Sequence, residues 1–193
     1  MGVNIAAVIE RLARFEIERV NALREFAQRS HEEEVKRLSE RAEGLTPDDE
    51  YLDVLVDERE FLNEIRRLSD QLATVALYRV VELNTVKAAR WRWKGKDAEG
   101  LYRIDRLRSK LRSELGVELS SLHGFSTIDE LRCANNAVKH RGKVSKELAA
   151  FPGWVEGEDL DGLNALNDRA ATSIPPYLRN LGEVLIPKTA AAS

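Results

Sequence analysis

Residues 41–51 read RAEGLTPDDEY, and this stretch divides two long segments that have helical periodicity. Gly44 is typical of the residue that follows a helix, because glycine adopts a left-handed backbone without strain. Thr46 followed by Pro47 is typical of a helix start, and the two aspartates that come next suit the positive end of a helix dipole. A connection this short makes the flanking helices antiparallel neighbours. The stretch therefore predicts a helical hairpin.

The two arms of the hairpin are predicted at residues 4–43 and 47–93. Each arm carries apolar residues at helical spacing, with one stutter near 16–19. From 28 to 43 the first arm is highly charged, so we expect this half to project from the core or to pack only on its hairpin partner. The apolar stripes consist of Ile5, Val8, Ile9, Leu12, Phe15, Val20, Leu23 and Phe26 in the first arm, and Leu55, Leu62, Ile65, Leu68, Leu72, Ala76, Val80 and Leu83 in the second.

The rest of the chain predicts shorter helices. We expect them at 101–115, 128–141, 161–171 and 175–186, with another short one at 145–151. Thr127 and Glu130, three residues apart, form a capping box for the helix at 128–141. No run alternates apolar and polar residues as a strand does. The predicted fold is all-α, an antiparallel bundle of four to six helices with a long N-terminal hairpin.

The length and composition are those of one globular domain. The chain has 193 residues, 43% hydrophobic and 33% charged. We predict a single domain over 1–186, with the extended hairpin at 4–60 and the bundle at 61–186, and a disordered tail at 187–193. A single cysteine, Cys133, excludes an internal disulfide and fits a reducing compartment. No apolar run approaches the roughly 18–20 residues that span a bilayer, so we expect a cytoplasmic protein without a membrane partner.

The net charge of −3 hides a strong segregation. Residues 87–146 hold 15 basic and 7 acidic groups, net +8, whereas residues 1–86 have a net charge of −7. A basic block of this size indicates an anionic partner, or it pairs with the acidic first half within the fold or across a dimer. Both interpretations remain open from the sequence.

The acid-free stretch LRCANNAVKHRGKVSK at 131–146 lies inside this block. On the predicted helix, Asn135 falls on the buried stripe. Arg132, Asn136 and His140 follow one another at four-residue intervals, so they form a second stripe on another face. A helix that ends in basic residues interacts favourably with its own dipole, which also favours the charged imidazolium of His140.

The segment LRCANNAVKHRGKVS at 131–145, followed by FPGW at 151–154, resembles the signature helix of the HEPN superfamily (higher eukaryotes and prokaryotes nucleotide-binding). This resemblance implies a four- or five-helix bundle. It also implies a dimer in which two such helices line one cleft, and in many members a metal-independent RNase of a toxin or phage-defence system. In that chemistry the histidine acts as acid or base, an arginine steadies the phosphate, and the RNA 2′-hydroxyl attacks the adjacent phosphorus.

The family motif is an arginine, four to six residues, and then a histidine, with a polar residue after the arginine. His140 matches the family histidine, and Asn136 matches the polar asparagine four residues before it. Asn135 stands where the arginine is expected, and Arg132 lies eight residues before His140, outside the motif's window. The resemblance thus implies His140, Asn136 and Arg132 as catalytic candidates. His140 can also be part of a site that binds RNA without cleaving it, or a structural group at the helix end.

Basic side chains near this motif and near the end of the second arm are candidates for nucleic-acid binding. They are Lys139, Arg141, Lys143, Arg90, Arg92 and Lys94. Trp91, Trp93 and Tyr102 are interleaved with them and could stack on bases, although two tryptophans two residues apart lie on different faces of a helix. We expect at least one of the two to be a core or rim residue.

The sequence predicts neither a metal site nor a cofactor. Its three histidines and one cysteine share no ligand spacing, and no glycine-rich phosphate loop is present. The expected partners are a second copy of the chain, RNA, and a protein partner or antitoxin. The main alternative to an RNA-directed function is a helical interaction protein without chemistry, in which the long hairpin forms a dimer or partner interface.

Overall fold

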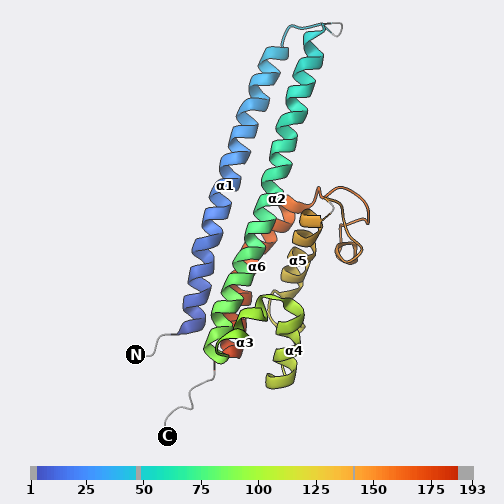
Figure 1. Cartoon of the computed structure of the whole chain (residues 1–193). Coiled ribbons are helices and arrows are strands. Elements are labelled where there is room, and N and C mark those ends of the chain that lie inside the picture. Colours follow the sequence, from blue (N-terminus) through green and yellow to red (C-terminus); the bar gives the residue numbers. More distant parts are fainter. Residues whose placement is uncertain (1–3, 47–48, 141, 187–193) are drawn as a thin grey trace.

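A computed structural model describes residues 4–46, 49–140 and 142–186 (Figure 1). The α-helices are α1 (Ile5–Ala42), α2 (Tyr51–Arg92), α3 (Lys96–Glu99), α4 (Ile104–Leu115), α5 (Phe125–His140) and α6 (Leu163–Leu185). Short 3₁₀ turns occur at Gly100–Tyr102, Leu119–Ser121 and Leu148–Ala150. The part of the chain that is described contains no strand, only an isolated bridge between Lys143 and Asp159. The predicted all-α helical bundle is therefore confirmed.

Helices α1 and α2 form the predicted antiparallel hairpin, which is the longest feature of the molecule (Figure 1). Contacts between the arms fix their register: Asn84 donates to Glu16 at 2.7 Å, and Arg41 pairs with Glu58 at 2.6 Å. α2 begins at Tyr51 instead of residue 47, and the Asp49 carboxylate accepts from the Tyr51 amide at 3.0 Å. Positions 47 and 48 of the predicted helix start lie outside the described residues, as does the predicted tail at 187–193.

The hydrophobic core lies at the base of the hairpin, where α5 and α6 pack against it. Ile9, Ala13 and Ile17 of α1 belong to this core, although they lie far from α6 in the sequence. α6 approaches α1 closely, since a β-carbon added at Gly182 would lie 3.1 Å from Ala6. The first arm therefore has two parts, an N-terminal half in the core and a charged half that packs only on α2.

α6 is one continuous helix, so the prediction of separate helices at 161–171 and 175–186 was wrong. Pro175 and Pro176 lie inside it, and each lacks the amide that would bond to the preceding turn. The helix persists because its apolar side packs against α1, α2 and α5, and Ile174, Tyr177 and Leu178 are almost completely buried. Tertiary packing here outweighs the local preference to break at proline.

α5 starts at Phe125, three residues before the predicted start. Thr127 lies inside the helix, so its predicted capping box with Glu130 does not form. The chain turns into α5 at Gly124, whose φ of 79° is left-handed and whose carbonyl accepts from the Ile128 amide at 3.3 Å. A β-carbon at Gly124 would also lie 3.2 Å from a carbonyl of α6, so both backbone angle and space favour glycine.

The apolar stripes of the hairpin face inward only in part. Ile5 and Val20 pack on the core and Ile9 belongs to it, but a set of the predicted stripe residues points to solvent. The exposed members are Val8, Leu12, Phe15, Leu23 and Phe26 on α1, and Ile65, Leu68, Leu72 and Leu83 on α2. None of the helices in the described ranges is long and apolar enough to cross a membrane.

Candidate functional site

The C-terminal end of α5 carries the candidate site. Ile128, Leu131 and Ala134 are fully buried and fix the helix against the core. This orientation leaves Asn136 and His140 exposed on the opposite side, one helical turn apart. Gly142, with a left-handed φ of 64°, ends the helix by donating its amide to the Ala137 carbonyl at 2.9 Å. The chain then turns back along α5.

Asn136 and His140 line an open hollow of about 740 Å³. The other walls come from the segment after the helix, and they include Lys143, Ser145, Lys146, Glu147 and Glu156. The hollow therefore combines one imidazole, one amide and one hydroxyl with charges of both signs. A space of this size is in the range of small-molecule and nucleotide sites.

The segment that forms the outer wall is held by backbone and side-chain contacts. The Val144 amide donates to the Glu158 carbonyl at 2.9 Å, and the Gly157 amide donates to the Val144 carbonyl at 3.0 Å. Lys143 pairs with Asp159 at 2.6 Å, and this bond lowers the pKa of the Asp159 carboxyl. These contacts hold Lys143 and the neighbouring turn in place beside α5.

Trp154 anchors the same segment to the bundle. Its Nε1 donates to the Glu130 carboxylate at 2.8 Å, and Arg169 of α6 donates to the same oxygen at 2.7 Å. The indole also lies against Gly162, where a β-carbon would be 3.0 Å from the ring. The FPGW motif and a buried acid of α5 thus set the shape of the hollow, which the sequence alone did not reveal.

Arg132 is engaged elsewhere. Its Nε donates to Asp129 at 2.7 Å, three residues back on the same helix, and its Nη2 donates to the Cys133 sulfur at 3.2 Å. Burial raises the pKa of the Cys133 thiol, so the sulfur is an uncharged acceptor at neutral pH. Eight residues of helix separate Arg132 from His140, which corresponds to about 12 Å along the axis. Of the three catalytic candidates, the structure brings Asn136 and His140 together in the hollow.

Asn135, at the position expected for the family arginine, is 2% exposed. Its Nδ2 donates weakly to the Asn136 side chain at 3.4 Å, and its Oδ1 is buried without a hydrogen-bond partner. A buried amide oxygen without a partner costs stability. The hydrogen bond links Asn135 to Asn136, the amide that lines the hollow.

The two predicted groups of basic residues lie apart. Gly142, next to Lys143, lines a hollow with Leu68 near the middle of α2, whereas Arg90, Arg92 and Lys94 lie at its C-terminal end. The 24 residues between positions 68 and 92 correspond to about 36 Å of helix. Lys139 is exposed beside His140, and Arg141 lies outside the described residues. The described basic residues therefore lie in two separate groups.

Many cations of the basic block are paired with nearby acids. Ion pairs of 2.6 to 3.9 Å are formed by Lys87, Arg90, Arg103, Lys110, Arg112, Arg132 and Lys143. Trp93 is buried and donates to Glu114 at 2.6 Å, whereas Trp91 is exposed. The expectation that one tryptophan is a core residue is confirmed. Most of these partners lie within the block itself, so the segregation seen in sequence is partly neutralised locally.

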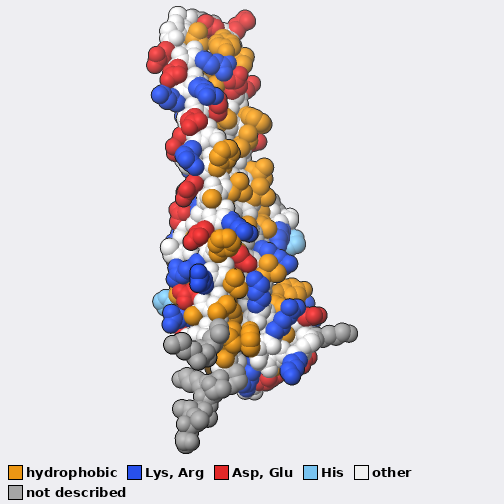
Figure 2. Space-filling model, turned by 90° about the vertical axis from the view of Figure 1, so that its left-hand side faces the viewer, with side chains coloured by type: hydrophobic (Ala, Val, Ile, Leu, Met, Phe, Trp, Pro, Cys, Tyr) orange, Lys and Arg blue, Asp and Glu red, His pale blue; other side chains and the backbone are white. Residues whose placement is uncertain are grey.

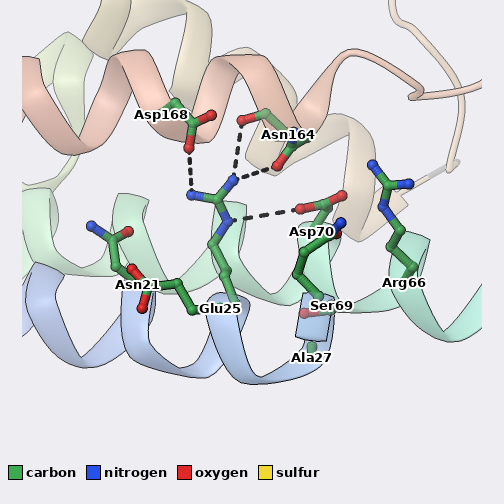
Figure 3. Close-up of a pocket in the computed structure, with 10 residues that line it drawn as sticks. Asn21, Glu25, Ala27, Arg66, Ser69, Asp70, Asn164 and Asp168 are labelled. Carbon is green, nitrogen blue, oxygen red and sulfur yellow. Dashed lines mark hydrogen bonds and ion pairs between the residues drawn. The ribbon is translucent and has the colours of Figure 1, made fainter. Parts of the chain in front are cut away.

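A second polar cluster, not foreseen from the sequence, lies where α1, α2 and α6 meet (Figure 3). Arg24 donates to Asp168 at 2.8 Å and to the Asn164 side chain at 2.6 Å, and it lies 3.8 Å from Asp70. Burial raises the pKa of the Asp70 carboxyl, and the nearby Arg24 charge opposes this effect. The sequence signal for this cluster is limited to Arg24, a charged residue on the inward side of α1. Within the described ranges, no cluster of three or more His, Cys, Asp or Glu residues could hold a metal ion.

Comparisons with known proteins do not extend this description. No protein-family model, no curated protein and no solved structure matches the chain. The site must therefore be interpreted from its own chemistry.

Proposed function

We propose that the protein binds RNA through the hollow at the C-terminal end of α5, as a HEPN-like protein. One observation carries the proposal: Asn136 and His140, which match the motif of that superfamily, are both exposed and line one hollow. An imidazole and an amide can donate hydrogen bonds to phosphate and ribose oxygens. Lys143, Ser145 and Lys146 add further donors on the opposite wall.

The charges around the hollow decide which groups attract the phosphate. The C-terminal end of α5 repels an anion, because the last carbonyls of a helix carry partial negative charge. Attraction must therefore come from Lys143 and Lys146. The ion pair between Lys143 and Asp159 is exposed, and such pairs contribute little energy, so a phosphate can compete for this lysine.

Cleavage of RNA is the activity that the family resemblance implies. In this proposal His140 is the acid or base, Asn136 orients phosphate or ribose, and no metal is required. Arg132 is held by Asp129 and lies about 12 Å from His140 along the helix, so a lysine must stabilise the phosphorane instead. The substitution of lysine for arginine favours binding over fast cleavage, because lysine lacks the bidentate fork. Such an enzyme would belong to a toxin or phage-defence system.

The binding proposal predicts a charge-dependent affinity for single-stranded RNA. At about 50 mM salt, Lys143→Glu/Lys146→Glu should weaken binding at least about tenfold and reduce the salt dependence, since each phosphate contact releases counterions. Fluorescence anisotropy with a labelled RNA oligonucleotide measures both effects. Lys36→Glu/Arg37→Glu, which makes the same charge change at two exposed positions on the projecting half of α1, is the control and should bind normally. Absence of binding by the wild type at low salt would exclude the proposal.

The cleavage step has a separate assay. Wild-type protein is incubated with the same RNA in EDTA beside His140→Ala and Asn136→Ala. Loss of cleavage in His140→Ala, with RNA binding reduced only slightly, would support an acid–base role. Equal cleavage by wild type and His140→Ala would reject that role, and no cleavage by either would leave RNA binding as the function.

A second candidate function is a helical interaction protein without chemistry. It is favoured by a specific observation, the row of large apolar side chains that α1 and α2 expose to solvent.

A further inference from the structure

The hairpin exposes a long row of large apolar side chains. We call it the hairpin stripe, and its ten members are between 39% and 65% exposed. They are Val8, Leu12, Phe15, Leu23 and Phe26 of α1, and Phe61, Ile65, Leu68, Leu72 and Leu83 of α2. Figure 2 shows hydrophobic side chains in an almost unbroken band along the length of one face of the molecule.

The spacing of the stripe is that of a coiled-coil seam. On α1, positions 8, 12, 15, 19, 22 and 26 alternate steps of four and three residues, and on α2 positions 61, 65, 68 and 72 do the same. Such a heptad pattern places side chains as knobs that need a facing helix. α1 already uses another seam, which includes Ala6, Ile9, Ala13 and Ile17, for the core. The outward seam has no facing helix within the described chain.

The α1 and α2 parts of the stripe lie on the same side of the hairpin. Lys87 of α2 pairs with Glu16 of α1 at 3.2 Å. Leu12 lies one turn from Glu16 on α1, and Leu83 lies one turn from Lys87 on α2, so both leucines flank this ion pair. Helix α6 contacts α1 from another direction, through Ala6. The stripe therefore faces away from α6, and its members Phe61, Ile65 and Leu68 also border a hollow with the segment just before that helix.

The exposed area is large enough for a stable interface. A large apolar side chain at half exposure leaves roughly 100 Å² accessible, so ten of them present on the order of 1,000 Å². The largest apolar patch on a monomeric protein is typically about 300–600 Å². A standard interface buries about 800 Å² on each partner. The stripe thus exceeds what a monomer usually exposes and matches one side of a dimer.

We propose that a second copy of this chain covers the stripe, in antiparallel orientation, so that the two hairpins form a four-helix bundle. The charge distribution identifies this partner. Residues 32–60, around the hairpin tip, hold 12 acidic and 4 basic groups, whereas residues 79–94, at its base, hold 5 basic groups and 1 acidic group. An antiparallel copy places each acidic tip beside the partner's basic base, and a parallel copy would bring the two acidic tips together.

The sequence spacing supports the same arrangement. α1 supplies most of the stripe near the base, and α2 supplies it near the tip. Reversing one copy brings the α1 part of the stripe in one chain level with the α2 part in the other. Both parts space their side chains by steps of four, three and four residues, so each side chain of one part has a counterpart at the same height in the other. In this register Leu12 shares a layer with the partner's Ile65, and Phe15 shares one with the partner's Leu68. Arg19, stacked 4.5 Å from the Phe15 ring centre, is the polar residue of the seam that can fix its register.

The decisive measurement is the mass of the full chain in solution, by sedimentation equilibrium or light scattering at about 1–50 μM. The wild type is expected to be a dimer. Phe15→Glu/Leu68→Glu should raise the dimer Kd at least about 100-fold, because both sites are central in the stripe. Tyr102→Glu/Val155→Glu, which adds the same charge at two exposed apolar residues outside the stripe, is the matched control and should remain dimeric. A monomeric wild type, or a dimer unaffected by the stripe variant, would overturn the proposal.

Orientation is tested by pulsed electron paramagnetic resonance with a spin label at Glu43→Cys, in a Cys133→Ser background. In the antiparallel dimer the two tips lie on opposite sides of the middle of the stripe. With a helical rise of about 1.5 Å per residue, they are then about 60 Å apart. A distance below about 25 Å would mean a parallel pair and would reject the antiparallel assignment.

The inference is independent of RNA binding, because the stripe variants leave Asn136 and His140 unchanged. Dimerisation and RNA affinity can therefore fail separately.

Discussion

The base of the molecule and the outer half of its hairpin are built from the same two helices, yet they are held together differently. At the base, α2 packs against α1, α5 and α6, and ten of its residues between Ala73 and Ala89 are buried. In the outer half, α1 is the only helix of the described chain that packs against α2, and among the described residues there Leu38 and Leu55 are the buried hydrophobic ones. Two helices in contact can bury one seam each, whereas a helix surrounded on three sides can bury most of its surface.

The free energy of folding comes mainly from the base of the molecule. The base forms one continuous core, and the outer half relies on a narrow seam and on exposed ion pairs such as Arg41 with Glu58. Exposed pairs contribute little. The outer half should therefore open locally at a lower free energy than the base unfolds, and covering its stripe with a second copy would supply the missing contacts.

Matched leucine truncations test whether the two regions differ in stability, and one of them should have a large effect. Leu178→Ala, in the core at the base, should lower the free energy of unfolding by about 2–5 kcal/mol, because the cavity cannot collapse among packed helices. Leu38→Ala removes the same atoms from the outer seam and should instead reduce the protection of nearby amides, with a loss of global stability under about 1 kcal/mol. Urea unfolding and hydrogen exchange followed by mass spectrometry measure the two effects. Equal global losses would mean that hairpin and base unfold as one unit.

The hairpin itself could be predicted because its signals are local. Gly44 ends one helical pattern and a new pattern follows within a few residues, so two long antiparallel helices were the natural interpretation. The direction of each stripe could not be predicted in the same way. α1 carries two heptad seams, and the sequence does not say which of them meets the core; only the positions of α2 and α6 decide this.

The candidate site was likewise predictable only in part. The four-residue spacing of Asn136 and His140 put both on one face of a helix, and the structure exposes both. Arg132 had the same spacing, but Asp129 lies three residues before it and holds its guanidinium. The outer wall of the hollow depends on Trp154, which reaches Glu130 across 24 positions of sequence, and helical periodicity carries no information about such a loop. Likewise, the prolines of α6 signal a break that tertiary packing overrides.

A second prediction concerns the junction between the two regions, where Arg24 joins α1 to α6. Its side chain is 12% exposed, and it is shared among Asp70, Asn164 and Asp168 (Figure 3). Arg24→Met keeps the apolar stem but removes the charge beside the half-buried Asp70 carboxylate, so the free energy of unfolding should fall by about 1–3 kcal/mol. Thermal or urea unfolding measures the loss.

Arg179→Met is the matched control for this prediction. Arg179 also joins α6 to α1, through Glu10 at 3.4 Å, but its side chain is 51% exposed. Its replacement should leave the unfolding midpoint almost unchanged, because water replaces an exposed ion pair. If both variants lost the same stability, burial of the Arg24 cluster would not be the reason for its effect.

The smallest expected effect is a change in pH dependence at the same junction. Burial raises the pKa of Asp70 above its ordinary value of 3.8, and the charge of Arg24 only partly offsets this. Between 3.8 and the raised pKa, the folded protein binds more protons at this site than the unfolded chain does, so this group makes stability fall as pH rises through that window. The cost is then constant up to neutral pH.

Asp70→Asn removes the titration and keeps an oxygen that can accept from Arg24. The stability of the variant relative to the wild type should therefore increase from about pH 3 to pH 7, as measured by urea unfolding of both proteins in parallel. A difference that stays constant with pH would show that the ionised Asp70 carboxylate carries no burial cost, and that the junction is as well hydrated as the outer half of the hairpin.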